Sequence, residues 1–208
     1  MLQQTQVERV IPHYEAWLAR WPTFAALAGV LPAEVIRAWR GLGYNRRALN
    51  LHRLARDVVE NHAGELPSAP VVLLGLPGVG SYTASAVRCF ARAERVVVTD
   101  TNIARVIAHD VAPRKDVSAA SLGEAAGALL PATAVRDHNL ALMDLGAVVC
   151  RARNPDCEAC PLRGRCSWKT AGSPAARAPA GPAPKFETTA RFARGRIIDA
   201  LREAPADI

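Results

Sequence analysis

The apolar positions of this chain recur every three or four residues over most of its length, which is the spacing of helices with one buried face. The first such stretch ends at Pro22 and predicts a helix with a single buried stripe, made of Val7, Val10, Ile11, Tyr14, Trp17, Leu18 and Trp21. A second helix is predicted to begin at Leu31–Pro32 and to end before Gly41, and a third to span residues 46–61.

Shorter helices are predicted in the remainder of the chain, over residues 71–76, 82–91, 100–108 and 137–150. Ser121 and Glu124 fit a capping box for one more helix that runs to Leu130. The short apolar run 95–98 is predicted to be extended. The pattern as a whole therefore indicates an all-α protein without internal repeats.

The last part of the chain has a different composition. Residues 171–184 are almost entirely Ala, Pro, Gly and Ser, which predicts a flexible linker, and residues 185–201 could form a short basic helix. No apolar run is long enough to span a membrane, and the first six residues lack the pattern of a signal peptide. We therefore expect a soluble cytoplasmic protein.

The net charge is +7, and 23 of the 26 basic residues are arginines, whose planar forks suit phosphate oxygens. Such a balance favours an anionic partner such as a nucleic acid. Coding bias in a GC-rich genome explains the arginines equally well, so the charge by itself does not decide between the two.

Four of the five cysteines lie close together, with six, two and five residues between them: Cys150, Cys157, Cys160 and Cys166. The fifth, Cys89, lies in an apolar stretch and is interpreted as a core thiol. Disulfides are not expected in an intracellular protein, so the four are candidate metal ligands. Their unequal loops favour a 4Fe–4S cluster, and a structural zinc ion is the alternative.

A turn rich in glycine separates two of the short helices, and it consists of Leu76, Pro77, Gly78, Val79 and Gly80. Successive backbone N–H groups at such a turn, followed by a helix N-terminus, can bind a phosphate of the DNA backbone. Many helical hairpins have Pro and Gly at the turn for structural reasons alone, and this alternative stays open.

This hairpin, the following Asp100 and the cysteine spacing together resemble the endonuclease III-like DNA glycosylases of the helix-hairpin-helix superfamily. The resemblance implies a six-helix barrel over residues 1–96, a 4Fe–4S cluster domain over 97–170 and an interdomain cleft, followed by a linker and tail over 171–208. It also assigns Asp100 as the catalytic carboxylate and the hairpin as a DNA-binding element. On the sequence alone, Asp100 could equally be a helix N-cap.

Two further segments, at residues 1–7 and 41–44, look like those of the adenine-specific mismatch glycosylases. On that resemblance the DNA-contacting residues outside the hairpin are Gln3, Gln4, Thr5, Leu42 and Tyr44. The superfamily's Asp-containing segment, residues 97–103 here, adds Asn102 to this set. Capping of a helix by Thr5 and core packing of Leu42 and Tyr44 are the structural alternatives. The implied partner is double-stranded DNA with a mismatched or oxidatively damaged base pair, bound by a monomer near the nucleoid.

Tyr82 occupies the place where bifunctional members of the superfamily carry a Schiff-base lysine. We therefore expect a monofunctional enzyme, in which Asp100 stabilises an oxocarbenium-like sugar and Tyr82 supports it. In the family, the acid that protonates adenine is a glutamate two residues before the position of Met1. We expect the chain to be N-terminally incomplete and its 208 residues alone to have little excision activity.

Three other functions fit parts of the pattern. A thymine or uracil mismatch glycosylase would share the hairpin, Tyr82, Asp100 and the cluster. A non-catalytic DNA-binding remnant would keep the hairpin but not the chemistry. A zinc-stabilised interaction domain would use the four cysteines for a structural metal ion.

Overall fold

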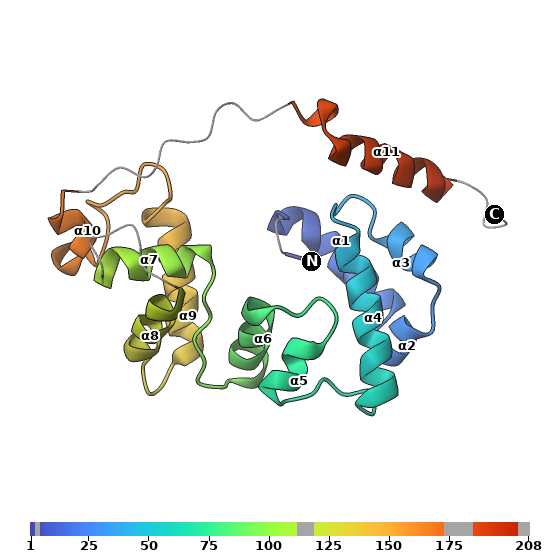
Figure 1. Ribbon diagram of the computed structural model, residues 1–208, viewed down its shortest axis with the longest axis horizontal. Coiled ribbons are helices and arrows are strands. Elements are labelled where there is room, and N and C mark those ends of the chain that lie inside the picture. The colour runs from blue at the N-terminus through green and yellow to red at the C-terminus, as the bar shows by residue number, and fades with distance from the viewer. Residues whose placement is uncertain (3–4, 112–118, 173–184, 204–208) are drawn as a thin grey trace. The chain divides into compact units, whose positions relative to one another are not determined.

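A computed structural model describes residues 1–2, 5–111, 119–172 and 185–203. Every regular element in those ranges is an α-helix, a 3-10 turn or a π turn, which confirms the all-α prediction (Figure 1). The chain forms two compact units, one of residues 1–78 and 180–208 and the other of residues 79–179.

The first unit contains six helices in the described ranges: α1 (Val7–Arg20), α2 (Phe24–Ala28), α3 (Pro32–Ala38), α4 (Arg46–Asn61), α5 (Pro70–Gly75) and α11 (Ala190–Glu203). Helix α4 packs against α2 and α3. Trp17 lies at the centre of the core, where its ring meets those of Trp21 and Trp39 edge-on at centroid distances of 4.7 and 5.5 Å. The core therefore depends on three large aromatic side chains.

Only part of the predicted apolar stripe of α1 is buried. Val10, Trp17 and Trp21 lie on one line along the helix and are buried. The other four predicted members are 42–54% exposed, and they are Val7, Ile11, Tyr14 and Leu18. The prediction was wrong for these four, because they lie on the adjacent side of the helix, which the described helices of this unit leave uncovered.

Helix α2 was not predicted from the sequence. It has five residues, too few for a periodic pattern, and it begins where the hydroxyl of Thr23 accepts a hydrogen bond of 3.1 Å from Ala26 N. The last helix of this unit, α11, was predicted, and its buried Arg202 donates to Ile36 O (3.0 Å) and Asn45 Oδ1 (2.9 Å). These two bonds hold α11 to the end of α3 and the start of α4.

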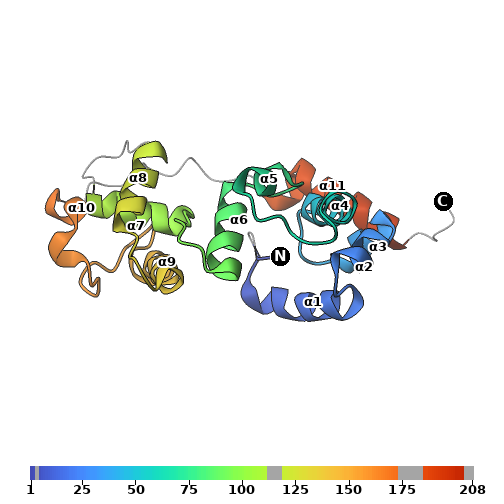
Figure 2. The same ribbon diagram turned by 90° about the horizontal axis from the view of Figure 1, so that it is seen from below.

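The second unit contains α6 (Ser81–Ala86), α7 (Thr101–Val111), α8 (Ala119–Leu129), α9 (Val135–Asp144) and α10 (Ser167–Thr170). Helix α7 is central and packs against α8, α9 and α10, as both views show (Figure 2). Ile103 and Ile107 of α7 pack against Ala126 of α8 in the core. None of the described helices is long and apolar enough to cross a membrane.

Two predicted helices of this unit end in π turns. Helix α6 continues into Val87–Ala91, and α9 continues into Leu145–Val149. The predicted capping box was wrong, because α8 begins at Ala119 and Ser121 therefore lies inside its first turn. The predicted domain boundary at residue 96 stays a prediction, while contacts within the structure divide the chain at Gly78, since the π turn at 87–91 packs against α9.

Candidate functional site

Asp100 is the N-cap of α7. Its Oδ1 accepts hydrogen bonds from the backbone N–H groups of Asn102 (3.0 Å) and Ile103 (2.7 Å), and its Oδ2 accepts one from Asn102 Nδ2 (3.0 Å). The structural interpretation of Asp100 is thus correct. It does not compete with a chemical role, because a carboxylate has about four acceptor positions and three are used here.

The backbone that leads to Asp100 is fixed by Asn139 of α9, which is 1% exposed. Its Oδ1 accepts from Val98 N (3.0 Å), and its Nδ2 donates to Val96 O (3.2 Å) and Val135 O (2.9 Å). One buried amide therefore replaces the neighbouring strand that an extended segment would otherwise need. Sequence reasoning missed this role, because a single polar residue on a helix carries no periodic signal.

Tyr82 lies on α6 of the same unit and is half-buried. Burial raises the pKa of its phenol above 10.0, and the negative charge of Asp100 raises it further. The hydroxyl of Tyr82 is therefore a neutral hydrogen-bond donor at physiological pH. Both predicted catalytic residues, Tyr82 and Asp100, lie in the second unit.

A set of contacts joins Asp100 to the segment that carries the four clustered cysteines, residues 150–166, called the cysteine loop below. Asn102 bonds to Asp100 through its Nδ2 and accepts from Arg105 Nη2 through its Oδ1 at 2.8 Å. Arg105 also donates to Gly146 O (2.5 Å) and through Nε to Cys150 O (2.6 Å). Both polar ends of Asn102 are thus engaged within the protein, and Arg105 is a second residue that the sequence did not reveal.

Gly146 lets this network form. A Cβ at this position would lie 2.6 Å from Asn102 Cβ, 2.8 Å from Asn102 O and 2.9 Å from Asn102 C. These distances are too short for any side chain. Gly146 is therefore required for the close approach of the π turn at 145–149 to the first turn of α7.

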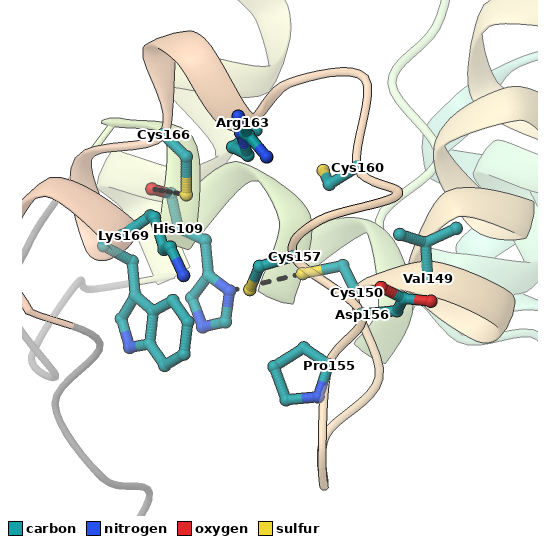
Figure 3. Close-up of a pocket in the computed structure, with 11 residues that line it drawn as sticks. His109, Val149, Cys150, Pro155, Asp156, Cys157, Cys160, Arg163, Cys166 and Lys169 are labelled. Atoms are coloured by element: carbon teal, nitrogen blue, oxygen red, sulfur yellow. Dashed lines mark hydrogen bonds between the residues drawn. The ribbon is translucent and has the colours of Figure 1, made fainter.

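The four clustered cysteines line one pocket together with His109, Trp168 and Lys169 (Figure 3). None of the four forms a disulfide, and all four are half-buried. The ring of His109 stacks on Trp168 with centroids 4.5 Å apart, and its Nδ1 lies 3.2 Å from Cys150 Sγ. Four thiols around one space are the donor set that an iron–sulfur cluster requires.

A structural zinc ion stays the alternative for the four cysteines. In the ranges that the structure describes, no three His, Cys, Asp or Glu side chains converge as ligands of one ion. Burial raises the pKa of the Cys150 thiol, and Arg105 opposes this shift. Cys89, by contrast, is fully buried in the core, as predicted.

The cysteine loop carries several basic side chains, but acidic partners neutralise part of their charge. Arg165 forms a two-pronged pair with Asp110, with Nε and Nη2 at 2.9 and 2.7 Å from the carboxylate oxygens. Arg163 and Lys169 both pair with Glu158. The Arg165 pair therefore links the loop to α7, while the two Glu158 pairs join neighbouring parts of the same stretch.

The glycine-rich turn begins with Leu76, whose side chain is buried, and Pro77 and Val79 are half-buried. Gly78 has a φ of +80°, and a Cβ there would lie 2.8 Å from Asn50 Cβ, so only glycine fits this position. Gly80 is exposed and caps α6, where its carbonyl accepts from Ala84 N at 2.9 Å.

The remaining predicted DNA-contacting residues lie in the first unit. Tyr44 is 43% exposed, whereas Leu42 is 4% exposed and packs in the core. A DNA contact by Leu42 is thus not supported, because its side chain fills the space between helices. Thr5 Oγ1 bonds to Leu42 O at 3.4 Å. The predictions for Gln3 and Gln4 lie outside the described residues.

The sequence of residues 1–127 matches the family model described as the HhH-GPD superfamily base excision DNA repair protein, and residues 150–166 match the iron-sulfur binding domain of endonuclease III. The chain belongs to the HhH-GPD superfamily. Its second unit holds an iron–sulfur cluster, and the ligands proposed from the spacing all fall within the matched segment.

Several relatives of this superfamily member are named adenine DNA glycosylases. The protein from Mycolicibacterium smegmatis is 44% identical over all of this chain and 71% of its own length. That from Mycobacterium tuberculosis is 45% identical over 98% and 68%, and the human protein is 40% identical over 80% and 31%.

Solved structures agree on the fold. A thermostable thymine-DNA glycosylase has a TM-score of 0.76 at 32% identity, covering 81% of this chain and 80% of its own. A trapped endonuclease III–DNA covalent intermediate has a TM-score of 0.72 at 24% identity, covering 81% and 80%. The helix-hairpin-helix glycosylase fold expected from the sequence is confirmed.

Proposed function

We propose that this protein is an adenine DNA glycosylase of base excision repair, which hydrolyses the N-glycosidic bond of adenine mispaired with guanine or 8-oxoguanine. The observation that carries the proposal is the identity of 44–45% to adenine DNA glycosylases over essentially the whole chain. The geometry around Asp100 supports it, since a carboxylate in a fixed orientation is what glycosidic bond cleavage requires.

Asp100 stabilises the positive charge that develops on the sugar as the base departs. The three hydrogen bonds that it accepts hold the carboxylate in one orientation before the substrate arrives, so little reorganisation is needed during the reaction. The target nucleotide has to leave the base stack first, because its glycosidic bond is not accessible within a duplex.

Tyr82 supports Asp100 as a neutral phenol. Its raised pKa keeps the proton on the hydroxyl, so Tyr82 can donate a hydrogen bond but is not a nucleophile at neutral pH. A Schiff base with the opened sugar needs an amine, and Tyr82 stands where bifunctional enzymes of the superfamily carry it. We infer that the protein releases the base without cleaving the strand.

The iron–sulfur cluster is of the 4Fe–4S type, held by Cys150, Cys157, Cys160 and Cys166. The cluster would have a structural role, because four thiolates bound to one rigid group would fix a loop that otherwise has little core of its own. Arg105 ties the backbone of Cys150 to the first turn of α7. Loss of the cluster should therefore loosen the surroundings of Asp100.

The partner is double-stranded DNA with a mismatched or oxidised base pair, bound by a monomer. The glycine-rich turn binds the phosphates of the DNA backbone through its own N–H groups, and this contact does not depend on the base sequence. Tyr44 and Thr5 contact the strand at the mismatch. Asn102 acts on DNA only indirectly, since its amide is bonded to Asp100 and Arg105.

Two readouts on the full-length product of the gene test the proposal. The first is affinity for duplexes with a non-hydrolysable 2′-fluoro-adenosine opposite 8-oxoguanine, opposite guanine or opposite thymine. The second is release of adenine under single-turnover conditions. We expect preference for the first two duplexes and a release rate that falls about 100-fold or more in Asp100→Asn.

Asp100→Asn is a suitable variant, because asparagine is an equally good N-cap and α7 should keep its start. Equal affinity for all three duplexes together with no adenine release would overturn the proposal. Thymine release is the second candidate activity, favoured by the 32% identity to a thymine-DNA glycosylase. Release of thymine from a G·T duplex in place of adenine would establish it.

A further inference from the structure

Arg47, the second residue of α4, bonds to two segments that are far apart in sequence. Its Nη2 donates to Thr5 Oγ1 (3.1 Å), Leu42 O (3.0 Å) and Gly43 O (3.3 Å). Its Nη1 donates to Met1 O at 3.0 Å. One planar guanidinium thus connects the start of the chain with the turn before α4.

That turn has an unusual backbone. Gly41, Gly43 and Tyr44 have φ angles of +88°, +68° and +49°. Tyr44 is not a glycine, so its left-handed conformation is unfavourable unless the surroundings impose it. Two hydrogen bonds hold the residue before Tyr44 in place, because Gly43 O accepts from Arg47 Nη2 and from Trp39 Nε1 (2.9 Å).

The guanidinium of Arg47 also lies against two aromatic rings. Its central carbon is 5.4 Å from the ring centroid of Tyr44 and 5.5 Å from that of Trp39. Trp39 is buried in the core, whereas Tyr44 is exposed. Because Arg47 also contacts the buried ring of Trp39, its cation–π contact with Tyr44 orients this exposed side chain.

We propose that Arg47 is a positioning residue that holds Thr5 and Tyr44 as one preformed surface for the mismatched duplex, and that it makes no phosphate contact of its own. The inference rests on the proposed function, which assigns DNA contacts to these two side chains. Its support is that both terminal nitrogens of the guanidinium donate within the protein, Nη1 to Met1 O and Nη2 to Thr5, Leu42 and Gly43.

Substitutions at Arg47 and at its neighbour Arg46 distinguish a positioning role of the side chain from an effect of its positive charge on DNA affinity. Arg47→Gln removes the fork and one charge, while Arg47→Lys keeps the charge without the planar fork. Arg46→Gln is the matched control, because Arg46 is exposed, adjacent on α4 and carries the same charge. Affinity is measured at several salt concentrations, for a duplex with 2′-fluoro-adenosine opposite 8-oxoguanine and for the fully paired duplex.

We expect Arg47→Gln and Arg47→Lys to lower the ratio of mismatched to paired affinity by about tenfold and to leave the salt dependence of affinity as in the parent. Arg46→Gln should leave the ratio unchanged. A purely stabilising role would lower the unfolding temperature in the Arg47 variants without changing the ratio, and this result would overturn the inference.

A phosphate contact gives a different result, in which Arg47→Gln weakens both duplexes alike and lowers the salt slope by about one. That outcome would also overturn the inference. Failure of the proposed function would be visible separately, as a parent protein that prefers no mismatch. In that case the contact between Arg47 and Thr5 is tested by the unfolding temperatures of Arg47→Gln, Thr5→Val and the double variant. Additive shifts would show that Arg47 does not hold Thr5.

Discussion

Replacing Asn139 by alanine tests whether one buried amide holds the segment before Asp100. The substitution leaves two backbone groups without their partner, Val98 N and Val96 O, whereas Val135 O keeps the backbone N–H of residue 139 as its partner within α9. Val98 is fully buried, so its N–H cannot return to water and bears the whole penalty, about 1–3 kcal/mol. The half-buried carbonyl of Val96 can recover some hydration and adds about 0.5–1 kcal/mol.

The sum is a loss of about 2–3 kcal/mol, which lowers the Tm of a chain of this size by about 4–12 °C. The assay is thermal unfolding followed by circular dichroism, combined with hydrogen exchange of the Val98 amide. Exchange at Val98 should accelerate by about tenfold or more, because its acceptor is gone.

Asp137→Asn is the matched control on the same helix. Asp137 is exposed and lies 4.0 Å from the exposed Arg136, so its loss should change stability by less than about 0.5 kcal/mol. A loss below about 1 kcal/mol in Asn139→Ala, with the Val98 amide still protected, would refute the reasoning. It would mean that packing of Val98, and not the amide, fixes the segment.

Gly146→Ala should cost about 1–3 kcal/mol, because its Cβ would overlap the backbone of Asn102, whereas Gly123→Ala in α8 meets nothing within 4 Å and should stabilise by up to about 1 kcal/mol; thermal unfolding of both compares them. The phenol of Tyr82 ionises at higher pH in the folded than in the unfolded protein, so its contribution to stability is constant below pH 10.0 and falls as the pH rises through the raised value. Tyr82→Phe should remove this alkaline loss, and identical profiles from pH 8 to 11 would contradict it. Iron and sulfide analysis should give about four of each per chain, and zinc instead would disprove the cluster type.

The sequence predicted the helices and the cluster well because both leave local signals. The periodic stretches of α1 and α4 and the spacing of four cysteines depend only on residues close along the chain. The resemblance added Asp100 and Tyr82, and the structure places both in one unit, where the charge of Asp100 contributes to the raised pKa of Tyr82. Helix α2 was missed because five residues are too short to display a period.

The residues that position the site could not be predicted in the same way. Three side chains bond to backbone atoms of segments that are distant in sequence: Asn139, Arg105 and Arg47. The identity of the residue at such a backbone partner gives no signal in the sequence. Gly146 is similar, since the need for glycine there comes from a helix about forty positions away.

The sequence by itself determined where the longer helices form, where the four cysteines cluster and that Asp100 could begin α7. Only the tertiary structure decided which apolar faces are covered, so that Trp17 is buried while Ile11 on the same helix is not. The physical reason is that helix formation and ligand spacing are local properties, whereas burial and long-range hydrogen bonding depend on which surfaces the folded chain brings into contact.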